Sequence, residues 1–255
     1  MILFPGYGTI IRVKERLDTA LVKRGLAQSR ERAKALIMEG KVIVDGRPVM
    51  KAGAQVNEEA DITVKGSGTP YVSRGGLKLM AAIERFGISL EGKAAMDIGA
   101  STGGFTDCML KEGARKVYAV DVGYGQFHWA LRNDPRVVLI ERTNIRYLQR
   151  ERIPDEMDII TVDASFISLK LVLPKAMEFL GAGGGIIALI KPQFEVGPKD
   201  VGKGGIVRDE APRLRAVEEI KGFSEGIGLQ TIGLMESPVA GHKGNIEYFI
   251  YLRRQ

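Results

Sequence analysis

The stretch from Met96 to Asp107, Met-Asp-Ile-Gly-Ala-Ser-Thr-Gly-Gly-Phe-Thr-Asp, constrains the fold more than any other part of the chain. An apolar, strand-like segment from Ala94 to Ile98 leads into it, and a helix-like segment from Phe105 to Glu112 follows. Three glycines between the two segments let the backbone turn tightly and approach a ligand without an intervening side chain. The stretch therefore predicts the first strand-to-helix turn of a nucleotide-binding α/β domain.

The spacing of these glycines indicates which cofactor the turn holds. It differs from the dinucleotide pattern G-x-G-x-x-G, because Ala100 and Ser101 replace the second glycine. The pattern Asp-x-Gly-x-x-x-Gly-Gly resembles the first motif of S-adenosylmethionine-dependent methyltransferases, and an ordinary strand-to-helix turn is the alternative. The residues expected to bind the cofactor here are Asp97, Gly99, Ala100, Ser101, Gly103, Gly104 and Phe105.

Composition narrows the class of protein. The 255 residues are 45% hydrophobic and 27% charged, which suits a globular protein with one large core or two smaller ones. No apolar run approaches the roughly 20 residues that span a bilayer, so we expect no stable membrane association. One cysteine excludes an intrachain disulfide, and two histidines argue against a zinc site. We expect a cytoplasmic protein without a metal.

Positive charge is concentrated near the N-terminus. Between Arg12 and Lys51, eleven Lys and Arg face five Asp and Glu, so this segment carries the whole net charge of +6. Such a concentration favours an anionic partner, most simply nucleic acid, although a solvated charged face is the alternative. The residues expected to contact RNA are Arg16, Lys23, Arg24, Arg30, Arg32, Lys34, Lys41 and, farther along the chain, Arg74.

The same region has the pattern of a small α+β domain. Helical patterns at 16–24 and 30–39 precede strand patterns at 41–44 and 61–64, with Asp45-Gly46 as a turn. This order resembles the RNA-binding domain named after small-subunit ribosomal protein S-four. A Gly/Ser/Pro-rich linker follows. The expected organisation is an irregular leader at 1–13, the S-four-type domain at 14–64, the linker at 65–72 and a second domain at 73–255.

Strands and helices alternate in the second domain. Further strands are expected at 117–122, 137–141, 157–163 and 186–190, and helices at 77–86, 169–180 and 209–225. Near-continuous apolar strands indicate a parallel sheet covered on both faces. Strands at 229–235 and 246–252 have no helix between them, so the last one should run antiparallel. The predicted fold class is α/β, a Rossmann-like methyltransferase sheet preceded by the small α+β domain.

Ligands of such a sheet lie beyond the carboxyl ends of the parallel strands. Asp121 ends the second strand and can accept hydrogen bonds from both ribose hydroxyls of a cofactor, and its alternative role is a helix-cap or turn aspartate. Asn144 follows the third strand and is expected near the adenine, although a loop asparagine is equally consistent with the pattern. Asp163 ends the fourth strand. It could reach both the cofactor and the reacting groups, and its alternative role is a helix cap.

Two lysines and a second carboxylate belong to the same edge. Lys191 follows the fifth strand directly, and Pro192 fixes the chain beyond it, so partial desolvation should favour the neutral form of the amine. Glu247 begins the reversed last strand and therefore returns to this edge. Lys78, on the helix before the first strand, could approach from outside the sheet. For either lysine, a simple contact to an anion is the alternative.

These motifs together resemble the TlyA family over Lys14 to Leu252. The matching stretches are Arg16-Leu17-Asp18, Ser73-Arg74-Gly75-Gly76-Leu77-Lys78, the glycine turn Asp97–Asp107, Val162-Asp163-Ala164-Ser165-Phe166-Ile167-Ser168, Leu189-Ile190-Lys191-Pro192-Gln193-Phe194-Glu195 and Gly244-Asn245-Ile246-Glu247-Tyr248-Phe249. The resemblance implies an S-four-type domain joined to an FtsJ-like domain that methylates cytidine ribose 2′-hydroxyls in ribosomal RNA. It also implies S-adenosylmethionine as cofactor, and ribosomal RNA or ribosomal subunits as partners.

The family's Lys-Asp-Lys-Glu tetrad matches Lys78, Asp163, Lys191 and Glu247. Under this resemblance Lys191 takes the ribose proton, Lys78 favours the neutral form of Lys191 by like-charge repulsion, and the two carboxylates orient the lysines. The segment 193–208 carries four glycines and three cations. It is a candidate lid over the substrate, or a disordered loop.

Proteins of other classes share parts of this pattern. An oxidoreductase uses a similar fold, but the glycine spacing and the Lys-Pro strand end argue against it. A pseudouridine synthase with an S-four-type domain does not explain the nucleotide-binding sheet, and a pore-forming haemolysin needs a membrane-spanning segment. The remaining alternative is a non-catalytic RNA-binding or ribosome-assembly protein with a vestigial cofactor site. The sequence leaves the modified nucleotide, the ribosomal subunit and the oligomeric state open.

Overall fold

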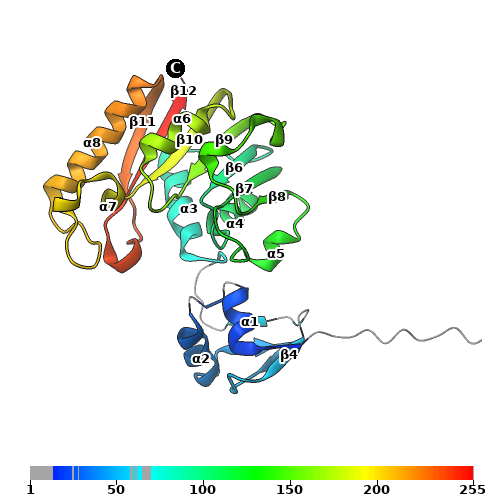
Figure 1. Cartoon of the computed structure of the whole chain (residues 1–255). Coiled ribbons are helices and arrows are strands. Elements are labelled where there is room, and N and C mark those ends of the chain that lie inside the picture. The colour runs from blue at the N-terminus through cyan, green and yellow to red at the C-terminus, as the bar shows by residue number, and fades with distance from the viewer. Residues whose placement is uncertain are drawn as a thin grey trace, which may run out of the picture. The chain divides into compact units, whose positions relative to one another are not determined.

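A computed structural model describes residues 14–24, 26–27, 29–57, 60, 62–64 and 70–254 (Figure 1). The chain separates into two compact units, Met1–Gly68 and Thr69–Gln255. The expected leader at 1–13 and most of the linker, 65–69, lie outside the described residues. None of the helices in the described residues combines the length and the apolar composition that crossing a bilayer requires.

The first unit packs two helices against short strands. Ser29 begins α2, since its side chain accepts a hydrogen bond from Arg32 N at 3.2 Å. Leu17, Leu21 and Ile37 are completely buried in its core. The elements are β1 (Lys14–Arg16), α1 (Leu17–Lys23), α2 (Arg30–Met38), β2 (Val42–Val44), β3 (Arg47–Pro48), β4 (Gln55–Asn57) and β5 (Ile62–Val64).

Both predicted helices and both predicted strands of this unit are present, and three further short strands add to them in the described residues. The Asp45-Gly46 turn joins β2 to β3, and β5 pairs antiparallel with the other side of β2. A separate antiparallel pair joins β1 to β4. β2 and β5 are equally short, but they are made of β-branched residues, Val-Ile-Val and Ile-Thr-Val. β1 and β3 contain no β-branched residue and β4 contains only Val56, so the sequence of those three strands carried little strand signal.

Arg24 differs from its expected place on a polar surface. The side chain is buried, and its guanidinium donates hydrogen bonds to the carbonyls of Ala60 at 2.5 Å and Asn57 at 3.2 Å. Glu15 lies 3.6 Å from the same group. Arg24 therefore joins α1 to the segment after β4. This role is structural, because the charged group is enclosed by backbone oxygens of its own unit.

The second unit contains a seven-stranded sheet in the order β11-β12-β10-β9-β6-β7-β8. Strands β6 to β10 pair in parallel, and β12 runs antiparallel to both of its neighbours, as predicted. The strands are β6 (Ala94–Ile98), β7 (Lys116–Val120), β8 (Val137–Ile140), β9 (Met157–Val162), β10 (Leu180–Ile190), β11 (Leu229–Glu236) and β12 (Tyr248–Arg254). This is the mixed, mostly parallel sheet that the sequence predicts.

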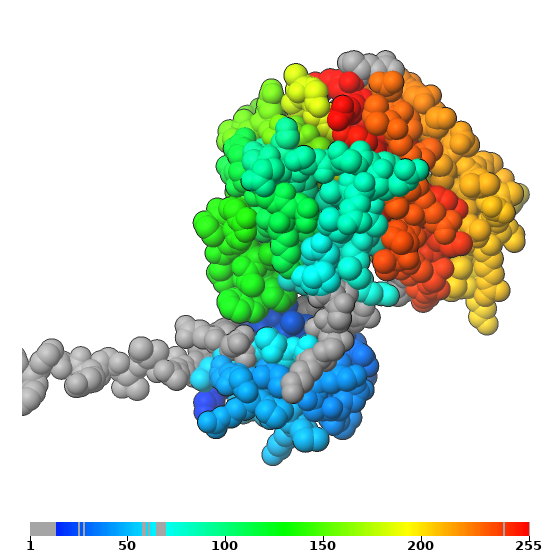
Figure 2. Space-filling model, turned by 180° about the vertical axis from the view of Figure 1, so that it is seen from behind, coloured from blue at the N-terminus to red at the C-terminus, as the bar shows by residue number. Residues whose placement is uncertain are grey.

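Helices cover both faces of this sheet. The helical elements are α3 (Arg74–Phe86), α4 (Gly104–Lys111), α5 (Trp129–Arg132), η1 (Ile145–Tyr147), η2 (Arg150–Arg152), α6 (Leu169–Met177), α7 (Pro192–Glu195), η3 (Pro198–Asp200), α8 (Glu210–Gly226) and η4 (His242–Gly244). Side chains of α6 and α8 form one core cluster with the strands, and those of α3, α4 and α5 form the other. In Figure 2 the face covered by α3 and α4 is turned toward the viewer.

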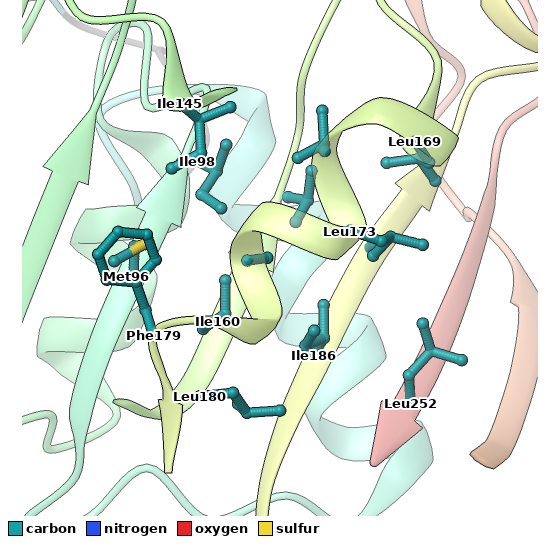
Figure 3. Packing of buried hydrophobic residues seen from close by; sticks show 14 of the residues in the cluster. Met96, Ile98, Ile145, Ile160, Leu169, Leu173, Phe179, Leu180, Ile186 and Leu252 are labelled. Atoms are coloured by element: carbon teal, nitrogen blue, oxygen red, sulfur yellow. The ribbon is translucent and has the colours of Figure 1, made fainter. Parts of the chain in front are cut away.

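Alternate residues of each strand enter opposite clusters. Met96 and Ile98 of β6 belong to the α6 and α8 side, whereas Ala95 belongs to the α3 and α4 side. Figure 3 shows α6 lying across the sheet, with Leu173 on the side of the helix that faces Ile186 of β10. Because both faces are covered, the central strands are apolar throughout, which explains their uniform hydrophobicity.

Asp97 is the exception in β6, since it is a completely buried carboxylate. The Thr106 hydroxyl donates to its Oδ2 at 2.6 Å, and the Thr161 hydroxyl to its Oδ1 at 3.2 Å. Burial nevertheless raises the pKa of Asp97 to about 7, because the charged form is desolvated. The side chain thus ties β6 to α4 and β9.

Replacing Arg24 with alanine should destabilise the first unit by at least about 2 kcal/mol, because each hydrogen bond to a charged group contributes roughly 1.5–3 kcal/mol. Hydrogen exchange of the amides in α1 and β5, measured in the full chain, reports this loss. The matched control is Arg32→Ala, whose exposed side chain should change stability by no more than about 0.5 kcal/mol. Equal protection in the two variants would contradict a structural role for Arg24.

Asp97 should make the stability of the second unit depend on pH. Its pKa is raised on folding, so between about pH 4 and pH 7 the unfolded chain loses a proton that the folded protein keeps. Stability should therefore fall as the pH rises through this range, by about 1.4 kcal/mol for each unit of the pKa difference. Asp97→Asn should remove this component, as measured by urea unfolding at several pH values. If the free energy of unfolding depended on pH in the same way in wild type and Asp97→Asn, Asp97 would not be the source of the pH dependence.

Candidate active site

The glycine turn between β6 and α4 lies against the end of β9. Gly99 has φ of +86°, and a Cβ atom there would lie 2.7 Å from the carbonyl oxygen of Asp163. Gly103 has φ of +93°, and its Cβ would lie 2.5 Å from Leu131 Cδ1. Both positions combine a left-handed backbone with a close neighbour, so only glycine fits. Ser101, between them, also has positive φ and is exposed.

Asp121, directly after β7, faces this turn. Its Oδ2 accepts a hydrogen bond from Ser101 N at 2.7 Å, and its Oδ1 accepts one from Gly123 N at 2.6 Å. A carboxylate offers about four lone-pair positions, so roughly two remain available for other donors. The expected ribose acceptor therefore lies beside the turn and also helps to hold the turn's shape.

Four other cofactor candidates belong more to the scaffold than to an open surface. Asp97 has both carboxylate oxygens engaged by threonine hydroxyls. Phe105 is buried, and its ring packs against Phe249 at a centroid distance of 6.2 Å, so its side chain belongs to the core. Gly104 and Ala100 are also buried, and a Cβ atom on Gly104 would clash with the Ser73 hydroxyl.

Asn144 lies beyond β8, where the sequence placed it. Its Oδ1 accepts a hydrogen bond from Arg146 N at 3.1 Å and begins the short helix η1. The side-chain amide, Nδ2, does not take part in this bond. The alternative role of a loop asparagine is thus present, and an adenine contact stays a prediction.

Lys78 and Glu247 form one of two ion pairs at the carboxyl edge of the sheet. Lys78 Nζ lies 2.6 Å from Glu247 Oε2, and the side chains are 11% and 2% exposed. Lys78 reaches this edge from the first half of α3, which Ser73 begins by accepting a hydrogen bond from Gly75 N. Buried charges are stable only when paired, so each group requires the other.

Lys191 and Asp163 form the second pair. Lys191 Nζ lies 2.6 Å from Asp163 Oδ1. It also donates hydrogen bonds to Ser165 Oγ at 2.8 Å and to the Asp163 carbonyl at 3.3 Å. Two of the three ammonium donors therefore make hydrogen bonds, and the contact with Asp163 Oδ1 is an ion pair, because this oxygen accepts no hydrogen bond. Pro192 begins α7 immediately afterwards and fixes the backbone beyond the lysine.

Strand register brings the two pairs to neighbouring positions. In the antiparallel ladder of β10 and β12, Ile190 is opposite Tyr248, so Lys191 and Glu247 are the next residues on facing strands. Asp163 comes from β9, the other neighbour of β10. The four residues of the predicted tetrad therefore gather along three adjacent strands and α3. Their arrangement alternates cationic and anionic groups.

An exposed aromatic ring lies beside the second pair, and periodicity did not single it out. Phe166 is 90% exposed and has φ of +62°, and its ring lies 5.0 Å from that of Phe194 on α7. A large apolar side chain held in a left-handed conformation in solvent is unusual in a purely structural loop. The only sequence signal was its position three residues after Asp163.

A second exposed aromatic group follows β7 and β8. Tyr124 is 64% exposed, and the Arg142 guanidinium stacks 3.9 Å from its ring centroid. Tyr147, 74% exposed, has Arg146 above its ring at 5.2 Å. Interleaved aromatic and cationic side chains at this edge suit stacking on bases and contact with phosphates.

The cations expected to contact RNA, all in the first unit except Arg74 of α3, fall into distinct environments. Asp18 is buried and pairs with Arg16 at 2.9 Å and Arg30 at 3.0 Å, and these arginines hold its pKa below the usual range. Both arginines are about half exposed. Arg24 is buried and therefore unsuited to RNA contact. The remaining predicted cations, Lys23, Arg32, Lys34, Lys41 and Arg74, are exposed, and Lys41 pairs with Glu39 at 2.7 Å.

Comparison with known proteins agrees with the division of the chain into two units. Residues 71–254 match the FtsJ-like methyltransferase family, and residues 15–62 match the S4 domain. The chain is 46% identical over 243 residues to "16S/23S rRNA (cytidine-2'-O)-methyltransferase TlyA" of Mycobacterium tuberculosis, covering 95% of this chain and 91% of that protein.

Two further similarities extend this finding. "23S rRNA (cytidine-2'-O)-methyltransferase TlyA" of Campylobacter jejuni is 38% identical over 71% of this chain and 70% of its own. A solved structure from Streptococcus thermophilus, provisionally named a hemolysin, has a TM-score of 0.73 and 42% identity. It covers 95% of this chain and 89% of its own. The chain belongs to the TlyA family, in which an S4 domain precedes an FtsJ-like methyltransferase domain.

Proposed function

We propose that this protein is an S-adenosylmethionine-dependent methyltransferase that modifies cytidine ribose 2′-hydroxyls in ribosomal RNA. The observation that carries the proposal is the pair of buried lysine–carboxylate contacts, Lys78–Glu247 and Lys191–Asp163. They lie at the edge of the sheet where the Gly99 turn meets Asp163. Family membership supports the same activity. Because ribosomal RNA is the proposed substrate, we expect a cytoplasmic protein.

The residues around the glycine turn fit this cofactor. Gly99 and Gly103 leave no room for side chains, and Ser101 and Asp121 face one another across the turn. We assign the ribose hydroxyls to Asp121, and the scaffold of the turn to Asp97, Gly104 and Phe105. When bound, S-adenosylmethionine supplies an electrophilic methyl group on a positively charged sulfur. The remaining catalytic work, activation and alignment of the ribose hydroxyl, belongs to side chains of this chain.

Lys191 is the proposed general base. In the structure its amine donates hydrogen bonds to Ser165 Oγ and to the Asp163 carbonyl, and it forms an ion pair with the Asp163 carboxylate. To act as a base, the amine must first lose a proton, and the ribose hydroxyl would then replace one of its present partners. Ser165 is the exposed one of these partners, so its hydroxyl is the one that we expect to be displaced. The neutral amine can then accept the 2′-hydroxyl proton.

The other three charged groups would orient this reaction. Asp163 holds the Lys191 amine at the strand end, and Glu247 holds Lys78 on the adjacent side. Lys78 can also contact the ribose or its phosphate.

Recognition of the RNA would involve both units. The exposed cations of the first unit supply a sequence-independent attraction to phosphates. Phe166, exposed beside Lys191 and backed by Phe194, provides a surface on which an unstacked base can lie. We propose ribosomal RNA, free or within a subunit, as the partner. Mapping ribose methylation in both ribosomal RNAs with and without this protein tests the function and identifies the nucleotide and the subunit.

Asp121→Ala should weaken S-adenosylmethionine binding by roughly 1.5–3 kcal/mol, because the ribose hydroxyls lose a charged acceptor. Part of this loss of affinity should come from disorder of the turn, since Asp121 also accepts hydrogen bonds from Ser101 N and Gly123 N. Calorimetric titration measures the change, and RNA affinity should stay close to wild type. Asp134→Ala, which removes a carboxylate from the far end of β8, is the matched control. Unaltered cofactor affinity in folded Asp121→Ala would exclude Asp121 from the site.

Lys191→Ala should nearly abolish methyl transfer and leave cofactor and RNA affinity close to wild type, because a base contributes mainly in the transition state. Lys191→Arg should also be inactive, since a guanidinium stays protonated at every pH the fold survives. The wild-type rate should rise with pH until the amine is neutral. Single-turnover methylation of ribosomal RNA across a pH series measures all three. Activity retained by Lys191→Arg would make this residue an anion clamp and leave Lys78 as the next candidate base.

A further inference from the structure

The segment 196–208, which begins five residues after Lys191, is attached at its far end to the connection between β11 and β12. Asn245, only 3% exposed, makes the attachment. Its Oδ1 accepts a hydrogen bond from Val207 N at 3.1 Å, and its Nδ2 donates one to the Gly205 carbonyl at 2.9 Å. Lys243 Nζ adds a third bond, to the Gly204 carbonyl at 3.1 Å.

The connection that carries Asn245 also carries Glu247. Glu247 accepts a backbone hydrogen bond from Ser237 N at 2.8 Å, and Gly241 N donates to the Asn245 carbonyl at 2.8 Å. A Cβ atom on Gly241 would collide with the Glu247 carboxylate, so the connection folds closely around this side chain. The loop 196–208 therefore starts beside one ion pair of the tetrad and is fastened beside the other.

The loop presents positive charge that its own unit does not neutralise. Lys199, Lys203 and Arg208 are exposed, and none of the three has a carboxylate partner among the described residues. The acidic Asp200, in contrast, pairs with Arg215 of α8 at 2.6 Å. Three unpaired cations on one fixed loop form a surface suited to phosphate groups.

We propose that Asn245 is a positioning residue that fixes the loop 196–208 and its three cations, Lys199, Lys203 and Arg208. This basic rim would bind the phosphates of the RNA backbone next to the tetrad. The proposal rests on the proposed function, because the rim gains its role from RNA entering this edge. Asn245 suits the task because one amide group supplies both the acceptor for Val207 and the donor for Gly205. Loss of either bond should release the loop without removing any charged group.

The first test is steady-state methylation of ribosomal RNA by full-length variants. Asn245→Ala should raise the KM for RNA about tenfold or more, the effect of losing two buried hydrogen bonds. Its affinity for S-adenosylmethionine should stay within about twofold of wild type. The KM of Asn245→Asp for RNA should lie between those of wild type and Asn245→Ala. A carboxylate still accepts a hydrogen bond from Val207 N but cannot donate one to the Gly205 carbonyl. Asn133→Ala, at the exposed end of α5, is the matched control.

A structural readout accompanies the kinetics. Trypsin should cut Asn245→Ala after Lys199, Lys203 or Arg208 at least several times faster than wild type, and bound RNA should protect wild type at these sites. Normal protease resistance together with a normal KM for RNA in folded Asn245→Ala would overturn the proposal. Wild-type protein without methyltransferase activity would instead refute the proposed function, so the two failures are distinguishable.

If Asn245→Ala does not fold, a variant that removes charge from the loop tests whether the loop cations contact RNA. Lys199→Ala/Lys203→Ala should raise the KM for RNA and flatten its dependence on salt, with kcat preserved. Lys93→Ala/Lys221→Ala removes the same charge outside the loop and should leave both quantities unchanged. Equal behaviour of the two double variants would show that the loop cations do not contact RNA.

Discussion

The active-site edge depends on a backbone contact between two strand ends. Gly99, after β6, approaches the Asp163 carbonyl after β9 so closely that no side chain fits between them. Asp163 N also donates a hydrogen bond to the Ile98 carbonyl at 2.9 Å. Because of this contact, the turn that would hold the cofactor and the loop that holds Lys191 are parts of one rigid arrangement. The spacing between the glycine turn and the Lys191 pair is thus set mainly by the sheet, and less by flexible side chains.

The antiparallel direction of β12 completes the site. A seventh parallel strand would begin at the opposite edge of the sheet, and a residue at its start would be a strand length away from Lys191. Reversal brings Glu247 across from Lys191 and lets it meet Lys78 from α3. The same reversal places Asn245 beside the tetrad. The antiparallel direction of β12 therefore places both Glu247 and Asn245, the attachment point of the basic loop, at this edge.

Much of this could be predicted from the sequence, and the failures have physical causes. β6 was predicted to the residue because five consecutive buried side chains make its pattern plain, whereas β10 begins six residues earlier than expected because its first half is rich in glycine. Asp163, Lys191 and Glu247 were expected at one edge because strand direction determines which strand ends meet, whereas Lys78, on a helix, joined them through the family resemblance. Arg24 was misplaced, since periodicity registers a charge but cannot show that backbone carbonyls enclose it. Asn245 and Phe166 depend on contacts between distant loops, which no local pattern contains.

The pairing inside the first unit changes what its net charge means for an approaching polyanion. Arg24 is enclosed by its own unit, and Arg16 and Arg30 both pair with Asp18, so three of the eleven Lys and Arg between Arg12 and Lys51 already contact partners within the fold. Only cations that phosphates can reach release counterions on binding. The electrostatic valence of this unit toward RNA is therefore smaller than its composition indicates. Asp18 also holds the half-exposed guanidinium groups of Arg16 and Arg30 in fixed positions. Two fixed positive charges favour an RNA whose phosphates have a matching spacing, whereas mobile charges attract any RNA.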